Sequence, residues 1–263
     1  MLNIKNIHKF FAQNTVNENH VLNGINLKIN SGDFITIIGS NGAGKSTLFN
    51  VISGNLMATS GEIKLDTKDI SGVKEYKRAN YIGRIFQNPL LGTAGKMTLE
   101  DNMMITSSKG FKGLKVSLNS KKRADFVEQL KILDMNLEGR LKDNVGLFSG
   151  GQRQALTLLM MVLSNPRLVL LDEHTAALDP RNAKKVLELT DLFIKEYNLT
   201  AMMITHNMEH AIKYGNRLLM MDKGEIILDV CGDEKKKLTV EILVKKFHDI
   251  RAEKFINDES LLS

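Results

Sequence analysis

The amino-acid sequence predicts an α/β fold in which a mixed β-sheet is flanked by helices and interrupted by a mostly helical insert. Three observations lead to this prediction. Strand-like segments fill residues 1–38, helical periodicity dominates residues 90–165, and strand-like segments return from residue 168. A glycine-rich segment at residues 39–47, GSNGAGKST, joins an apolar strand to a helix. A chain of 263 residues can bury one large core with a subdomain attached.

The first elements follow from their periodicity. Strands are predicted where apolar and polar residues alternate or run together: LNIKNI, VLNGINLKI, FITII and GEIKLD. A helix is predicted after the glycine-rich segment, because Leu48, Phe49 and Ile52 have the spacing of one helix face. In the insert, Thr98 with Asp101 three residues later is typical of a helix start.

The later elements alternate between buried strands and amphipathic helices. Within the insert, a second helix would present Phe126, Val127, Leu130 and Leu133 on one face. The continuous apolar runs LVLL and AMMI are typical of parallel strands covered on both faces, with the helix AKKVLELTDLFIKEY between them and the strands RLLMM and EIILD after them. The tail after Thr239 is predicted to form one amphipathic helix that frays at its end.

Composition restricts the class of protein. The chain is 43% hydrophobic and 25% charged, as in an ordinary globular protein. Its longest apolar run, ALTLLMMVL, has about half the length that a membrane span needs. A single cysteine, Cys231, excludes an internal disulfide and fits a reducing compartment. The net charge of +6 is spread without an aromatic-interleaved basic platform, so we expect a solvated surface rather than a nucleic-acid partner.

The segment 39–47, called the phosphate loop below, matches the pattern G-x-x-x-x-G-K-[ST] in full. Its glycines let backbone N–H groups turn toward a phosphate at a helix N-terminus. Lys45 would reach the β- and γ-phosphates of ATP, and the Ser46 hydroxyl would hold Mg²⁺. The predicted nucleotide-binding residues are Gly39, Ser40, Asn41, Gly42, Ala43, Gly44, Lys45, Ser46 and Thr47.

Two acidic residues follow the predicted strand LVLL. Asp172 lies at the strand end, where a phosphate-loop NTPase places its metal-side aspartate. Glu173 comes next and is placed to orient or deprotonate a water that attacks the γ-phosphate. An Asp-Glu pair at a strand end is common by itself; the phosphate loop upstream gives this pair its significance.

A further set of motifs occurs in order along the chain: Gln87 in IFQNP, SGGQ at residues 149–152, Asp172-Glu173, Ala177-Leu-Asp179 and His206. This set resembles the ATP-binding subunits of ABC transporters over about residues 3–230. The resemblance implies one domain over residues 1–263. Its parts would be a RecA-like core with an antiparallel β subdomain (1–89 and 166–230), a helical subdomain (90–165) and a C-terminal tail (231–263).

The resemblance also implies a role for the second glycine-containing segment, called the signature loop here and formed by Ser149, Gly150, Gly151 and Gln152. Two subunits would meet head to tail, and the signature loop of one would close over the γ-phosphate bound by the other. Ser149 is a good helix N-cap, the glycines permit close approach, and the following helix would aim its positive end at an anion. ATP-bound homodimers are therefore expected.

The remaining roles are carried over residue by residue. Gln87 would contact Mg²⁺ and the attacking water, together with the metal ligands Ser46 and Asp172. His206 would hold the γ-phosphate, and Asp179 would act across the dimer interface. Phe11 would stack on adenine, with Phe10 as its competitor.

This sequence departs from the family pattern at three positions: Phe148 in place of leucine, His174 where many relatives have proline, and Ala176 in place of serine. We interpret His174 as a packing or surface variation. None of the three changes removes a chemically required group, so an active ATPase is expected.

The implied partners are transmembrane permease subunits, a second ATP-binding subunit and, indirectly, an extracytoplasmic substrate-binding protein. The permease would bind residues 88–104, where Leu90, Leu91, Met97 and Met103 form an adaptable groove or, alternatively, fill the helical insert. The chain would then lie on the cytoplasmic side of the membrane. Stretches such as LLDEHTAALDP resemble bacterial importers labelled tryptophan/tyrosine-type. The alternative is a soluble ABC-type ATPase that remodels a protein assembly, such as iron–sulfur assembly.

Overall fold

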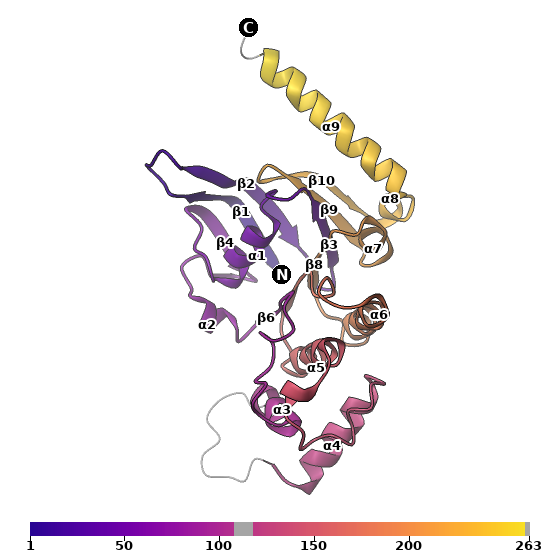
Figure 1. The fold of residues 1–263 in the computed structure, drawn as a ribbon. Coiled ribbons are helices and arrows are strands. Elements are labelled where there is room, and N and C mark those ends of the chain that lie inside the picture. Colours follow the sequence, from indigo (N-terminus) through magenta and orange to yellow (C-terminus); the bar gives the residue numbers. More distant parts are fainter. Residues whose placement is uncertain (108–117, 261–263) are drawn as a thin grey trace. The chain divides into compact units, whose positions relative to one another are not determined.

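The computed structural model describes residues 1–107 and 118–260, and it divides into two compact units (Figure 1). Unit 1 comprises Met1–Val73 and Met202–Ser263, and unit 2 comprises Lys74–Ala201. Residues 108–117 of the predicted helical insert lie outside the described residues, as do the last three residues of the tail. The α/β fold class predicted from the sequence is confirmed.

Unit 1 contains a four-stranded antiparallel sheet in the order β2-β1-β4-β5. Alternation explains it, because Leu2 and Ile4 of β1 are buried while Asn3 between them is more accessible. The register pairs Leu2 with Ile29 on one side and with Leu65 on the other. The strand bounds are β1 Leu2–Phe11, β2 Asn19–Ile29, β4 Ser60–Leu65 and β5 Lys68–Asp69.

The second group of strands in unit 1 carries the phosphate loop. Strand β3 is parallel to β9, with Ile35 opposite Arg217 and Gly39 opposite Met221, and β10 continues the group as an antiparallel neighbour of β9. Strand β8 lies on the other side of β3. The bounds are β3 Phe34–Gly39, β8 Ala201–Ile204, β9 Arg217–Asp222 and β10 Glu225–Cys231.

The helices of unit 1 follow these strands. Helix α1, Lys45–Ser53, buries Leu48, Phe49 and Ile52 as predicted, and it ends at Gly54 in the left-handed conformation. Helices α7, α8 and α9 form the C-terminal part, and Leu243 of α9 is fully buried in a cluster with Leu218 of β9. Their bounds are α7 Met208–Lys213, α8 Gly232–Lys236 and α9 Val240–Ser260. The predicted helix after Thr239 is therefore present.

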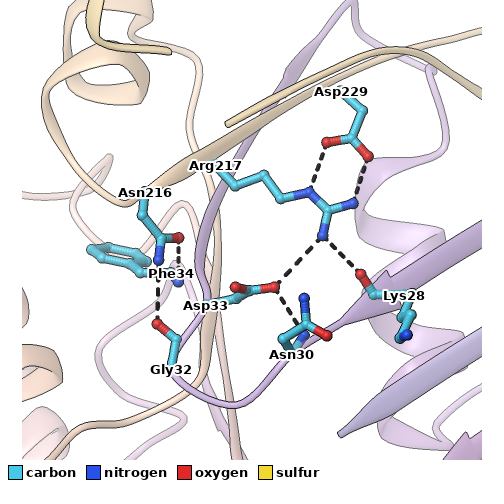
Figure 2. A network of polar contacts seen from close by, with 8 residues as sticks. All are labelled: Lys28, Asn30, Gly32, Asp33, Phe34, Asn216, Arg217 and Asp229. Carbon is cyan, nitrogen blue, oxygen red and sulfur yellow. Dashed lines mark hydrogen bonds and ion pairs between the residues drawn. The ribbon is translucent and has the colours of Figure 1, made fainter. Parts of the chain in front are cut away.

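A polar network in unit 1 ties the antiparallel sheet to the second strand group (Figure 2). The Arg217 guanidinium of β9 makes a bidentate ion pair with Asp229 of β10 and donates to the backbone O of Lys28 in β2. Its third partner is Asp33, at 3.6 Å. Charged hydrogen bonds of this kind are stronger than neutral ones, so one side chain fixes three segments.

Unit 2 contains most of the predicted helical insert and one pair of parallel strands. Strand β6 pairs with β7, with Ile82 opposite Leu168. Thr98 and Asp101 form the predicted cap, since the Thr98 hydroxyl donates to Asp101 and accepts from its backbone N–H. The bounds are α2 Glu75–Arg78, β6 Ile82–Ile85, α3 Leu99–Ser107, α4 Ser120–Lys131, α5 Gly150–Leu163, β7 Leu168–Asp172 and α6 Pro180–Glu196, with a 3₁₀ turn η1 at Val145–Leu147.

Candidate functional site

The phosphate loop runs from the end of β3 to the start of α1. Gly39, Gly42 and Gly44 all have positive φ, at 155°, 77° and 95°. A side chain at Gly39 or Gly44 would collide with backbone, because a Cβ there would lie 2.2 Å from Met221 O and 2.7 Å from Val21 O. The glycines therefore permit both the turn and the close packing of the loop on its neighbours.

Lys45 lies inside the phosphate loop. Its ammonium donates to the backbone O of Gly39 and of Ser40, at 2.9 Å each, and the residue is only 6% exposed. A buried ammonium held by backbone carbonyls is a concentrated positive charge beside the N-terminus of α1. This arrangement suits the binding of an anion such as a nucleotide phosphate.

The phosphate loop is anchored to the turn between β9 and β10. The Ser40 hydroxyl donates to Asp222 at 2.9 Å, and the Gly224 N–H donates to the backbone O of Ala43 at 3.2 Å. Sequence reasoning missed Asp222 and Gly224. The signal available was the Asp-Lys-Gly turn that follows the buried strand RLLMM.

His206 lies near the start of the phosphate loop. It follows β8, where Thr205 N–H donates to the backbone O of Ile37 at 3.1 Å. His206 lines a cavity of about 180 Å³ together with Gly39 and Ser40. Phe247 of α9 lines the same cavity. The structure thus brings His206 and the phosphate loop together, as the sequence set suggested.

The two candidate aromatic residues for adenine differ in their surroundings. The Phe10 ring stacks on His20, with centroids 3.9 Å apart. Phe11 is 37% exposed, and the Lys9 ammonium lies 5.2 Å from its ring centroid. An exposed ring beside a cation is better suited to receive an adenine base than a ring already covered, so the geometry favours Phe11 over Phe10.

In unit 2, Asp172 lies at the end of β7 and is paired. The Arg84 guanidinium of β6 donates to its carboxylate at 2.9 Å, with side chains only 10% and 14% exposed. Sequence reasoning missed Arg84, because the strand IGRI gives no sign of its partner 88 residues away. The Arg84 guanidinium also lies 4.7 Å from the Phe86 ring centroid, beside the exposed Gln87.

Glu173 follows Asp172 with φ at 47°, the left-handed region that non-glycine residues rarely adopt. Backbone strain of this kind is concentrated at functional sites, where the surrounding structure maintains it. Glu173 is half-buried.

The signature loop begins α5 with a complete capping box. The Ser149 hydroxyl accepts from Gln152 N–H, and the Gln152 carboxamide accepts from Ser149 N–H. Ser149 and Gly150 are exposed, whereas a Cβ at Gly151 would lie 2.5 Å from the Asn182 side chain. The predicted N-cap is confirmed, and the positive end of α5 starts at an exposed serine and glycine.

Asp179 caps the next helix of the same unit, α6. Its carboxylate accepts from the backbone N–H of Asn182 at 3.1 Å and from the Asn182 side chain at 2.6 Å. The backbone and side-chain hydrogen bonds from Asn182 lower the pKa of Asp179 below its ordinary value. Asp179 therefore stays ionised at an exposed position. Its hydrogen-bond partner Asn182 is also the residue that packs against Gly151 of the signature loop.

The three departures from the family pattern are accommodated. Phe148 is 4% exposed and lies under the Arg140 guanidinium, while Ala176 is exposed. His174 is 2% exposed, and its ring nitrogen Nε2 lies 3.0 Å from the Thr190 hydroxyl. His174 is therefore a packed interior residue, which agrees with the packing interpretation.

The segment 88–104 shows both behaviours that its apolar residues allow. Leu90 and Leu91 are 57% and 65% exposed, and Met97 is 38% exposed. Met103 is fully buried in the core of the unit. Three of the four side chains are thus available to a partner, and the fourth fills the helical insert.

The donor set suits Mg²⁺ only with help from a nucleotide. Within residues 1–107 and 118–260, no group of three His, Cys, Asp or Glu side chains could hold a metal ion. Mg²⁺ prefers oxygen ligands and is typically bound by one or two carboxylates plus substrate phosphates. Ser46 in unit 1 and Gln87 and Asp172 in unit 2 each carry side-chain oxygen atoms, the donor type that Mg²⁺ prefers.

None of the helices in the described part of the chain has the length and apolar character to cross a membrane.

Comparison with known proteins adds three similarities. The ABC transporter family model matches residues 22–176. A tyrosine transport ATP-binding protein from Clostridioides difficile (strain R20291) is 45% identical over 248 residues, which cover 94% of this chain and 98% of that protein. A methionine import ATP-binding protein from Enterococcus faecalis (strain ATCC 700802 / V583) is 36% identical over 245 residues, covering 92% of this chain and 68% of that protein.

Solved structures agree in fold. A dimeric ATP-binding cassette in a post-hydrolysis state, bound to ADP and Pi, aligns with a TM-score of 0.73 at 25% identity. The alignment covers 88% of this chain and 98% of that chain.

Proposed function

This chain belongs to the ABC transporter family as an ATP-binding subunit with ATPase activity, and we propose that it powers the import of an amino acid, with tyrosine as the first candidate. The ATP-driven part of this proposal rests on the exposed Ser149, which caps the positive end of α5, in a chain that also holds a phosphate loop packed closely at its glycines. One chain thus offers two anion-binding helix ends. The tyrosine candidate rests on the 45%-identical relative.

The phosphate loop binds the triphosphate of ATP. Lys45 supplies the positive charge, residues 39–47 supply backbone N–H groups, and Phe11 stacks on the adenine. His206, beside the start of the loop, holds the γ-phosphate. Ser46, Asp172 and Gln87 would hold Mg²⁺, which would supply positive charge to neutralise the phosphates.

Hydrolysis depends on the residues that follow β7. Glu173 orients and deprotonates the attacking water as a general base, and Gln87 contacts that water. Two subunits meet head to tail, so that Ser149, Gly150, Gly151 and Gln152 of one subunit close on the ATP of the other. Asp179 acts across the same interface. A similar solved ATP-binding cassette is a dimer bound to ADP and Pi, which supports the proposal that two subunits associate.

The permease is proposed to dock on the exposed Leu90, Leu91 and Met97, which places the chain on the cytoplasmic side of a membrane. Affinity purification of the tagged chain from detergent-solubilised native cells tests this. We expect a multi-span membrane protein to co-purify, and the double variant Leu90→Asp/Leu91→Asp to lose it.

The matched control is Ile132→Asp, which changes a residue of similar character that is 40% exposed in the same unit. Retention of the membrane protein by the Leu90/Leu91 variant would contradict the docking site. Recovery of soluble partners only, with the chain absent from the membrane fraction, would contradict the transporter function.

The cargo proposal has a separate test. The name of the 45%-identical relative supports tyrosine, and that of the 36%-identical relative makes methionine its rival. Uptake of labelled tyrosine should fall in cells that lack this chain and return when the gene is restored, but not when Lys45→Ala is supplied. Unchanged tyrosine uptake with loss of methionine uptake would contradict the tyrosine proposal.

A further inference from the structure

Gln154 of helix α5 connects the two segments that carry the proposed catalytic residues of unit 2. Its carboxamide nitrogen lies 3.1 Å from the backbone O of Phe86 and 2.7 Å from the backbone O of His174. Phe86 precedes Gln87, and His174 follows Glu173. Both acceptors are carbonyl oxygens, so the amide nitrogen, and not its oxygen, must face them.

Burial at this position costs free energy for the polar side chain of Gln154. Gln154 is 1% exposed, and its carboxamide oxygen is buried without a hydrogen-bond partner among the described residues. Burying an unsatisfied polar atom is costly, and an apolar side chain would fill this space without that penalty. The two donated hydrogen bonds are what the glutamine adds.

His174 is held from a second direction. The Thr190 hydroxyl of α6 donates to the backbone O of Val186 at 2.8 Å, so it accepts from His174 Nε2–H, 3.0 Å away. His174 and Thr190 are 2% and 1% exposed. The residue after Glu173 is therefore fixed by its carbonyl to α5 and by its ring to α6.

Glu173 needs such fixing because its φ of 47° is a conformation that the chain would otherwise leave. The His174 carbonyl belongs to the peptide that follows His174, so the hydrogen bond from Gln154 restricts His174 directly and thereby limits how far the adjoining Glu173 can move. The same carboxamide restricts the peptide that leads into Gln87. Helix α5, which holds Gln154, also begins at Ser149 of the signature loop.

We propose that Gln154 is a positioning residue for hydrolysis. It holds the segments of Glu173 and Gln87 in fixed positions relative to α5, the helix that begins at the signature loop. Gln154 touches no substrate in this proposal and acts through these two segments. The inference rests on the proposed role of Glu173 as general base.

The test is Gln154→Met, which keeps the side-chain length and removes the donor. Since a small displacement of a reacting group slows chemistry strongly, kcat should fall about 10- to 100-fold. The KM for ATP and ATP-dependent dimerisation should change less than about 3-fold, because the phosphate loop and the signature serine are untouched. A structural role alone would lower thermal stability and leave kcat per folded molecule unchanged.

The matched control is Val162→Ala, on the same helix and 3% exposed, which should lower the melting temperature without lowering kcat. Normal kcat in folded Gln154→Met overturns the inference. If Gln154→Met does not fold, Thr190→Val replaces it: this variant loosens the other attachment of His174 and should lower kcat about 3- to 10-fold, and wild-type kcat would overturn the inference.

A double variant separates this inference from the proposed function. In a Glu173→Gln background, Gln154→Met should reduce single-turnover hydrolysis by less than about 3-fold, since its main effect passes through the missing base. Full additivity would overturn the inference while leaving the general base in place. Wild-type turnover by Glu173→Gln alone would remove the general-base role itself, and the inference with it.

Discussion

Two alanine substitutions in the phosphate loop, Gly42→Ala and Gly44→Ala, separate backbone strain from steric collision. Both glycines have positive φ, at 77° and 95°, so an alanine at either position costs about 1–2 kcal/mol of backbone strain. The surroundings differ. A Cβ at Gly42 would meet nothing within 4 Å, whereas a Cβ at Gly44 would lie 2.7 Å from Val21 O and 3.0 Å from a Leu22 methyl group.

The collision at Gly44 is severe because its partner is backbone. Ordinary contact begins at 3.4 Å, so the Cβ would intrude by 0.7 Å (3.4 − 2.7). Overpacking of this kind costs roughly 1–3 kcal/mol in addition to the strain. The total for Gly44→Ala is then about 2–5 kcal/mol, against about 1–2 kcal/mol for Gly42→Ala.

The assay is thermal unfolding of the nucleotide-free protein. At about 3 °C per kcal/mol for a chain of this size, Gly42→Ala should lower Tm by roughly 3–6 °C and Gly44→Ala by roughly 6–15 °C. The affinity for a fluorescent ATP analogue should also fall further in Gly44→Ala, because the loop must shift away from β2. Equal Tm shifts in the two variants would refute the claim that the phosphate loop is packed tightly on β2.

Three further predictions concern charged side chains. Arg217→Met removes the three contacts of the Arg217 guanidinium that Figure 2 shows, with Asp229, the backbone O of Lys28 and Asp33, and should lower the free energy of unfolding in urea by about 2–4 kcal/mol. Asp229→Asn, at a 40% exposed carboxylate, should lower it by about 1 kcal/mol or less, and equal losses would contradict the assignment of Arg217 as the central residue. Burial lowers the pKa of Lys235 to about 8 from 10.5. The unfolded chain therefore binds more protons between these values, and the free energy of unfolding should rise with pH across that window relative to Lys235→Met, by at most about 1.4 kcal/mol per pH unit; parallel pH profiles in thermal melts would contradict it. Arg84→Met removes the guanidinium that pairs with Asp172 and would compete with Mg²⁺ for its carboxylate, so the Mg²⁺ concentration that half-saturates nucleotide binding should fall roughly 3- to 10-fold, and Tm should fall as well. An unchanged or higher Mg²⁺ concentration would contradict the claim that Arg84 competes with Mg²⁺ for Asp172.

Local patterns were sufficient to predict the phosphate loop, most of the longer strands and helices, and the caps at Thr98 and Ser149, whereas β5, β6, α2, α7 and α8 were not predicted. Each of these depends on residues within a few positions of one another, where the backbone geometry is set by neighbouring side chains. The glycine pattern also locates the end of the loop, since Gly44 is the residue directly before α1.

Contacts between distant segments were not predictable in the same way. The Ser40–Asp222 bond joins residues 182 positions apart, and Arg84 meets Asp172 only because β6 and β7 are parallel neighbours. Composition also could not separate the exposed Leu90 from the buried Met103, since both are apolar and lie in one segment. These outcomes depend on tertiary packing rather than on local propensity.

The most direct test of the account is sedimentation velocity of the Glu173→Gln chain with and without MgATP. Loss of the base should trap bound ATP, so we expect a monomer without nucleotide and a dimer with it. Ser149→Arg in the same background should bind ATP with normal affinity and remain a monomer, because the exposed signature serine must approach the partner's phosphate. A normal ATP-dependent dimer of the Ser149→Arg/Glu173→Gln chain would contradict the proposal that the signature loop closes over the nucleotide of a second copy.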